Sequence, residues 1–162
     1  MIIDPQEVPT ERGTNYPDVF KAMVAGRSRQ RLGKFAGLKN FGVNLVKLEP
    51  GSYSALRHWH SHQDEFIYIL EGELTLITDE GEQILTPGMA AGFPAGEANG
   101  HHLVNRSSVV GVYLEVGDGL RPTIGHRTPN DVGTFPDVPD FSTLPSPDGV
   151  TREFTYEDGR LY

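Results

Sequence analysis

The chain contains no cysteine, and this absence excludes disulfide bonds and thiolate metal sites. Any bound metal ion must therefore be held by histidine, carboxylate or carbonyl groups. An excess of positive charge is also missing, because the net charge at pH 7 is -8. Since contacts to phosphates require a basic face, we expect no nucleic-acid partner.

Long apolar segments are absent as well. The opening residues MIIDPQEVPTERG hold no basic patch followed by an apolar stretch, so we expect no secretory signal. The apolar runs are far too short to span a bilayer, which predicts that the protein has no membrane partner. The expected location is therefore the cytoplasm.

Turn-forming residues are abundant, with 19 glycines and 12 prolines among 162 residues. From Phe41 onward, β-rich segments and turns alternate roughly every 8 to 12 residues, which is typical of an all-β sandwich or barrel. We predict one domain with three parts: an N-terminal arm over residues 1–40 that packs on the barrel, a barrel over 41–120, and an extended tail over 121–162. The tail is expected to wrap the barrel or a partner subunit.

The central motif is His58-Trp59-His60, followed by Glu65. Side chains two apart on a strand leave the same face, so both imidazoles can share one ion, and Glu65 can reach the same point across a tight turn. A fourth ligand must come from elsewhere, and His101 is the best candidate because it opens a strand after a glycine-rich turn. Its neighbour His102 is predicted to point to the other face.

Two ordered motifs resemble those of the cupin superfamily. The first comprises Gly51, His58-Trp59-His60, Glu65 and Gly72, and the second comprises Gly88, Pro94-Ala95-Gly96, His101 and Asn105. The chain departs from the family pattern in two gaps, which are one residue longer before His58 and two residues longer before His101. As a result, Asn99 occupies the usual histidine position, while the spacing from His101 to Asn105 is intact.

The resemblance implies a double-stranded β-helix, or jelly-roll barrel, that holds one divalent transition metal ion on His58, His60, Glu65 and His101. Zinc, nickel, manganese, iron and cobalt all suit such ligands, and the ligand types do not choose among them. The chain is similar to small bacterial cupins, some of which carry a sugar-phosphate isomerase label. Because barrels of this kind leave sheet edges and apolar outer faces, we also predict a homodimer.

Three functions are compatible with such a site. A metal-dependent isomerase of sugars or sugar phosphates is the first choice, and Glu65 and His102 are its predicted catalytic residues; His62 and Glu97 are further candidates for the base. An iron(II)-dependent dioxygenase and a non-enzymatic module that binds a small ligand are the alternatives.

Alternation along the strands predicts a mainly apolar cavity beside the metal. The expected lining residues are Ser54, Leu56, Ile67, Ile69 and Leu103, whereas Arg57 and Arg106 should point away. The basic cluster of Arg27, Arg29, Arg31 and Lys34 is interpreted as a solvated edge strand, with a phosphate-binding patch as the less favoured alternative. A cavity without charged side chains would argue against a phosphorylated substrate.

Overall fold

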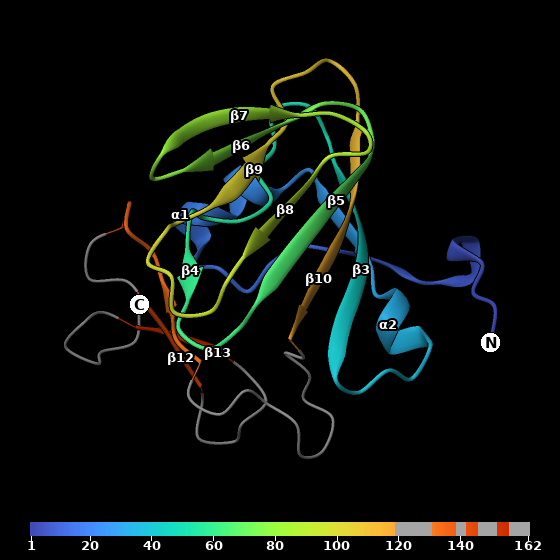
Figure 1. Ribbon diagram of the computed structural model, residues 1–162, viewed down its shortest axis with the longest axis horizontal. Helices are drawn as coiled ribbons and strands as arrows, with labels where there is room; N and C mark the ends of the chain where they lie inside the picture. Colours follow the sequence, from blue (N-terminus) through green and yellow to red (C-terminus); the bar gives the residue numbers. More distant parts are fainter. Residues whose placement is uncertain (119–130, 139–141, 146–151, 156–162) are drawn as a thin grey trace.

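The structure is a computed structural model that describes residues 1–118, 131–138, 142–145 and 152–155. It is built mainly from antiparallel strands (Figure 1), as the alternation of β-rich segments and turns predicts. The larger sheet contains six strands in the order β1 (Thr10–Arg12), β2 (Arg27–Gln30), β3 (Phe41–Leu48), β10 (Gly111–Asp118), β5 (Glu65–Glu71) and β8 (Ala90–Phe93).

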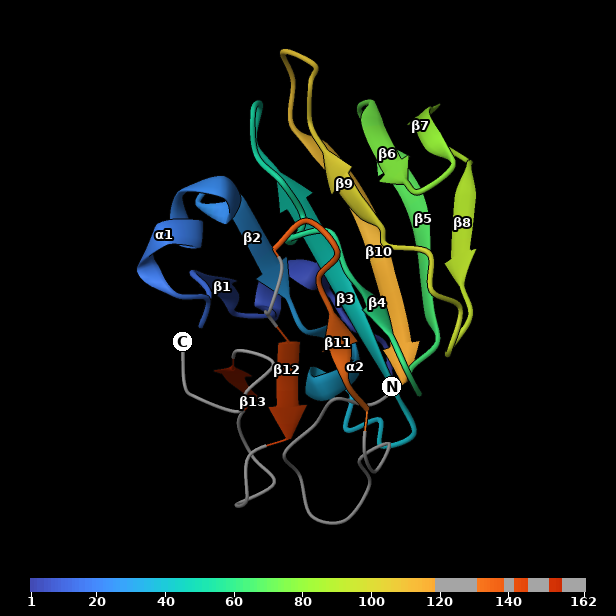
Figure 2. The ribbon, with the colours of Figure 1, turned by 90° about the vertical axis from the view of Figure 1, so that its left-hand side faces the viewer.

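Two smaller sheets complete the strand set. One has three strands in the order β7 (Gly81–Leu85), β6 (Leu74–Thr78) and β9 (His102–Val104). The other has four strands in the order β13 (Arg152–Thr155), β12 (Ser142–Pro145), β11 (Gly133–Thr134) and β4 (Trp59–His60). The three-stranded sheet lies toward one end of the larger sheet, and β12 and β13 lie toward the other end (Figures 1 and 2).

The hydrophobic core joins the larger sheet to the three-stranded sheet. Its buried members are Val46, Leu48, Ile67, Ile69, Leu74, Leu76, Leu85, Leu103 and Tyr113. On β3, β5 and β6 these residues are spaced by two, so one face of each sheet packs inward while the other faces outward. The arrangement is the all-β jelly-roll that the sequence predicts.

The N-terminal arm contains one strand that belongs inside the larger sheet. Strand β2 pairs with β1 on one side and with β3 on the other, so the interpretation of this basic segment as a solvated edge strand is wrong. Short helical turns flank it: η1 (Pro5–Glu7), α1 (Asp18–Lys21), η2 (Ala22–Val24) and α2 (Leu32–Phe35). Among the described residues, no helix is long and apolar enough to cross a membrane.

The segment that leads into the histidine motif is less regular than expected. Over residues 52–60, only Trp59–His60 forms a strand, preceded by isolated bridges at Tyr53 and His58. Leu56 between those bridges packs with Phe135 in a second apolar cluster, which draws this segment away from regular pairing.

One glycine is required by close packing at the end of β5. Gly72 has a φ of 73°, in the left-handed region that glycine adopts freely. A Cβ atom at this position would also lie 2.6 Å from the carbonyl oxygen of Val110. Both constraints hold the turn from β5 to β6, and therefore the direction of the strand that begins at Glu65.

Candidate metal centre

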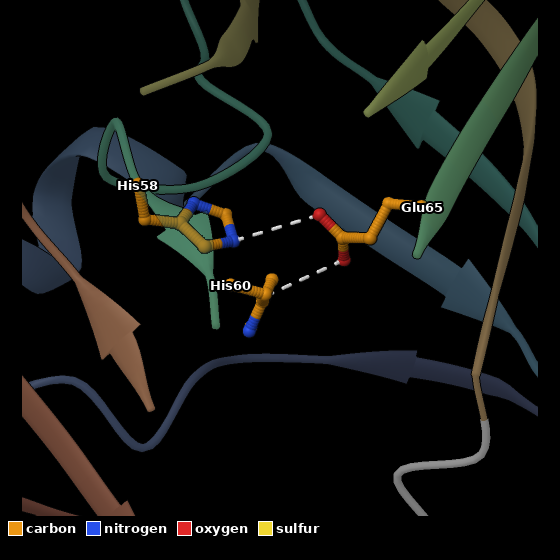
Figure 3. Close-up of side chains that lie close together, drawn as sticks. All are labelled: His58, His60 and Glu65. Carbon is orange, nitrogen blue, oxygen red and sulfur yellow. Dashed lines mark ion pairs between the residues drawn. The ribbon is translucent and has the colours of Figure 1, made fainter. Parts of the chain in front are cut away.

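His58, His60 and Glu65 bring three potential metal ligands together inside the barrel. One ligand atom from each residue lies within 4.8 Å of the others. The His58 Nε2 atom is 3.9 Å from Glu65 Oε2, and the His60 Nε2 atom is 3.7 Å from Glu65 Oε1. Both imidazoles point toward the carboxylate from the segment opposite β5 (Figure 3). The predicted convergence of these three side chains is therefore present in the fold.

His101 approaches the same carboxylate from a third direction. Its Nε2 atom lies 2.9 Å from Glu65 Oε2. The backbones of His58 and His101 form an isolated bridge, with N–H to O distances of 3.2 and 2.9 Å, which sets the two residues side by side. The position of His101 beside Glu65 is compatible with the predicted role of fourth ligand. That role stays a prediction.

The outer nitrogen of each imidazole is held by an oxygen acceptor. The Nδ1 atom of His58 lies 2.8 Å from the Leu56 carbonyl oxygen, and that of His101 lies 3.3 Å from the Asn99 carbonyl oxygen. The Nδ1 atom of His60 lies 2.8 Å from Asp131 Oδ2. A neutral ring that donates from Nδ1 presents the lone pair of Nε2 inward, which is the orientation typical of histidine metal ligands. The donor set thus fits one divalent ion.

Asp131 is a site residue that sequence reasoning missed. It is buried, and its second oxygen accepts the backbone N–H of His62 at 2.9 Å. Strand β11 brings it there, because Gly133 pairs with His60. No local motif marks this aspartate, since its place depends on pairing between two segments about 70 residues apart in the chain.

Two aromatic rings pack against the imidazoles. Phe93 on β8 stacks on His101 with ring centroids 3.6 Å apart and planes tilted by 4°. Phe135, which follows β11, stacks on His58 at 5.6 Å and 23°. These contacts restrict rotation of both histidines and shield them from water. The described part of the tail therefore contributes to the site through both Asp131 and Phe135.

The charges of the site match what metal binding requires. Burial lowers the pKa of His58 to about 3, and the neighbouring His60 and His101 act in the same direction. Burial alone would raise the pKa of Glu65, but its hydrogen bond with His101 and the other imidazoles bring the pKa to about 2. Near neutral pH the site thus offers a neutral His58 ring and an ionised carboxylate, the forms that bind metal.

Comparisons with known proteins agree with this geometry. The family model for the cupin domain matches residues 44–117. The crystal structure of a cupin-superfamily sugar phosphate isomerase from Silicibacter pomeroyi is 40% identical, covers 100% of this chain and 96% of its own, and superposes with a TM-score of 0.89. The chain belongs to the cupin superfamily.

Other solved structures show how widely the fold is used. A proposed sugar phosphate isomerase from Acidithiobacillus ferrooxidans is 26% identical, covers 84% of this chain and 80% of its own, and has a TM-score of 0.69. A polyketide cyclase from Streptomyces resistomycificus, at 21% identity, 78% and 87% coverage and a TM-score of 0.62, shares the fold alone. No curated protein matches the chain. The fold by itself therefore does not fix the reaction.

The other predicted site residues of this cupin lie at different distances from the metal centre. His102 lines the main cavity, with its Nδ1 atom 3.1 Å from the Ala55 carbonyl oxygen and its ring against Tyr53. His62 is exposed and its Nδ1 atom lies 2.8 Å from Ser61 Oγ. Glu97 lines a second cavity, which His60 and His101 also line. The catalytic roles of Glu65 and His102 stay predictions.

The main cavity has a volume of about 260 Å³, and His58, His60, Glu65 and His101 all line it. Ser54, Ile67 and Leu103 line it as predicted, whereas Leu56 and Ile69 are buried in packing clusters. Arg57 and Arg106 point away as predicted, and each pairs with acidic side chains outside the cavity.

The prediction of an uncharged cavity wall is wrong. Arg27, Arg29 and Arg31 all line the cavity. The error has a simple physical cause: alternation along a four-residue strand shows which residues share a face, but the pairing with β3 decides which face turns inward.

Proposed function

We propose that this cupin is a metal-dependent enzyme that isomerises a small sugar or sugar phosphate. The observation that carries the proposal is the convergence of the His58, His60 and His101 Nε2 atoms on the Glu65 carboxylate. Further support comes from the sugar phosphate isomerase from Silicibacter pomeroyi, with 40% identity over nearly the full length of both chains. The cavity of about 260 Å³ suits a small metabolite.

A divalent ion on these four residues would supply Lewis-acid polarisation of a substrate carbonyl oxygen. The chain supplies the remaining functions. The imidazoles, held by their Nδ1 contacts, keep the ligand set in place. Phe93 and Phe135 cover two of the rings and keep water away from the reacting end of the cavity.

Aldose–ketose isomerisation also needs a base that takes a proton from the carbon beside the carbonyl and returns it to the neighbouring carbon. Glu65 and His102 are the two proposed acceptors. The Ala55 carbonyl holds Nδ1 of His102 as the donor, so Nε2 is left as the acceptor, and burial lowers the pKa of His102. The neutral ring is therefore the form that can accept the proton near neutral pH.

The proposal is tested by proton exchange on a sugar phosphate in heavy water. Wild-type protein loaded with metal should exchange the carbon-2 proton of ribose 5-phosphate for deuterium, observed as loss of its proton resonance. Chelation or His58→Ala should abolish the exchange, whereas the exposed His62→Ala control should retain it. Absence of exchange for phosphorylated and free pentoses and hexoses in fully loaded protein would contradict the isomerase assignment.

The two acceptors are separated by the same assay. If His102 is the base, His102→Gln should keep bound metal and slow the exchange about 10²- to 10⁴-fold. Glu65→Gln should lose both metal and exchange, because it removes the carboxylate on which the three Nε2 atoms converge. Full exchange in His102→Gln would assign the proton to another group.

We also propose a homodimer, formed through the outer face of the larger sheet. Phe66, Tyr68 and Leu70 on β5 are 44%, 38% and 38% exposed. Their neighbours on β10 are Val116 opposite Phe66 and Leu114 opposite Tyr68, so the exposed apolar surface is continuous across two strands. Light scattering at micromolar concentration should give twice the chain mass, and Tyr68→Lys should shift it toward the monomer. A monomeric wild type would refute this assembly.

A further inference from the structure

Two arginines of β2 face the interior of the barrel. Arg27 pairs with Leu48 and Arg29 pairs with Val46, and both partners are fully buried core residues. Residues opposite one another on neighbouring strands share a face of the sheet, so Arg27 and Arg29 extend from the same face as the core. Both line the main cavity.

These two arginines differ from the others that the structure pairs with acids. Arg31 binds Glu11, Arg57 binds Asp79 and Asp137, and Arg106 binds Glu82. Within the described ranges, neither Arg27 nor Arg29 has an ion-pair partner, and the Arg27 guanidinium donates to the Ser54 carbonyl oxygen. Burial and the adjacent charge of Arg29 lower the pKa of Arg27. Unpaired charge is costly inside a protein, so an anion bound at this wall would stabilise both groups.

Within the described residues, Tyr113 is a second, independent example of a polar group on this wall without a partner. Its side chain is 1% exposed and lines the cavity, and its hydroxyl has no hydrogen-bond partner among the residues that the structure describes. Tyr113 pairs with Val46 on the side opposite Arg29, so the two residues belong to one cross-strand row on the inner face. A buried hydroxyl without a partner is uncommon in folded proteins and calls for an acceptor.

Three carboxylates also line this cavity, those of Glu65, Asp118 and Glu115. Glu115 lies two residues beyond Tyr113 on the inner face of β10. Its Oε1 atom accepts a hydrogen bond from Asn44 Nδ2 at 2.8 Å, and the carboxylate acts on Arg27 and Tyr113 only through its charge. Among the described residues, none of these carboxylates forms an ion pair with Arg27 or Arg29, so neither guanidinium is neutralised by direct contact.

We propose that Arg27, Arg29 and the Tyr113 hydroxyl form an anion subsite that binds a phosphate or carboxylate group of the ligand. This inference rests on the proposed function in one respect, namely that the same ligand reaches the metal centre with its other end. Tyr113 lies four residues before Gly117, which pairs with Glu65. Along the strand this separates the two rows by roughly 13 Å, and the side chains close part of that distance, which suits a ligand of several carbons.

The test compares a neutral sugar with probes that carry an anionic group. Ribose 5-phosphate, ribonate, ribose and inorganic phosphate are titrated calorimetrically into the full chain, both stripped with chelator and loaded with metal. Wild type should bind an anionic probe at least about tenfold more tightly than ribose, because a hydrogen bond to a charged group is lost with the neutral sugar. Whichever of ribose 5-phosphate and ribonate binds more tightly identifies phosphate or carboxylate as the preferred anionic group.

Variants assign the preference to these residues. Arg29→Gln and Tyr113→Phe should each reduce it severalfold or more, Arg29→Lys should restore part of it, and Arg106→Gln, an exposed and paired control, should leave it unchanged. An undiminished preference in Arg29→Gln and Tyr113→Phe, or no binding of any anion at millimolar concentration, overturns the subsite.

Metal content measured on the same samples keeps this failure distinct from that of the metal centre. Anion preference in stripped protein does not depend on the metal. Anion binding without metal uptake would therefore refute the metal centre alone, whereas metal uptake without anion preference would refute the subsite alone.

Discussion

The two ends of the cavity differ in how their polar groups are satisfied. At the histidine end, each outer imidazole nitrogen has an oxygen partner and the inner nitrogens surround one carboxylate. At the arginine end, within the described part of the chain, Arg27 and Arg29 have no ion-pair partner and the buried Tyr113 hydroxyl has no hydrogen-bond partner. The first end is organised by the chain itself for an ion, and the second is left for a ligand to complete. Polar groups inside a fold normally have partners within the fold, so buried polar groups without partners indicate a place where a ligand binds.

The largest change in stability is expected when the proposed metal ligands at the histidine end are removed. A metal ion present at about 1,000 times its dissociation constant should raise the free energy of unfolding by about 4 kcal/mol. For a chain of this size that corresponds to a rise in Tm of roughly 8–16 °C. Glu65→Gln should abolish the rise, and the exposed Glu73→Gln should keep it. Equal metal-dependent stabilisation in both variants, measured by calorimetry, would contradict the assignment of Glu65.

Acid should weaken the histidine end in metal-free protein. The pKa of His58 is about 3 in the fold against 6.5 for the free side chain, so between these values the unfolded chain binds the additional proton. Stability should therefore fall as the pH drops below 6.5, by roughly 2.5 kcal/mol from pH 7.5 to 4.5. The pKa of Glu65, about 2 against 4.5, adds to the loss only below pH 4.5. Urea unfolding checks the slope, and an unchanged slope in His58→Gln would assign it to other groups.

The contact from Asp131 to His60 tests how the histidine end is held in place, because Asp131 is not one of the proposed metal ligands. Asp131→Asn should leave the fold intact but weaken metal binding about 10- to 100-fold, because it loosens the orientation of His60. Competition with a chelating indicator measures the change. Asp137→Asn, which affects a pair with Arg57 on the outside, is the matched control. Wild-type affinity in Asp131→Asn would show that the contact does not position the ligand.

Replacing an arginine at the arginine end should change the free energy of unfolding in the opposite direction to replacing an arginine in an ordinary ion pair. Without ligand, Arg29→Met should stabilise the protein by about 1 kcal/mol, because it replaces a half-buried charge that has no ion-pair partner. Arg57→Met should destabilise it by about 1 kcal/mol, because Arg57 pairs with Asp79 and Asp137. Chemical denaturation of both variants measures the difference. A loss of stability in Arg29→Met would indicate that Arg29 serves the fold.

The histidine end could largely be anticipated from the sequence, and the arginine end could not. Alternation placed His58 and His60 on one face, and Glu65 followed within a few residues, so local spacing was enough. The direction of Arg27 and Arg29 depends on the register of β2 against β3. A short polar strand carries no hydrophobic pattern that would indicate which of its faces is buried.

The same limit applies to the tail. Asp131 and Phe135 reach the site because β11 pairs with β4, a contact between distant segments that no periodicity reveals. Strands and turns alternate between Phe41 and Asp118 as predicted, since β-branched residues and turns rich in glycine and proline mark them locally. Local patterns therefore predicted the barrel, and long-range pairing completed its site.

Metal content of the purified full chain is the most direct test of the account. Mass spectrometry on protein prepared without a histidine tag should find about one equivalent of a divalent transition metal in wild type and in His62→Ala. His58→Ala should hold almost none. Wild-type protein that contains no metal and takes up none on titration would contradict the central claim that the three histidines and Glu65 form a metal centre.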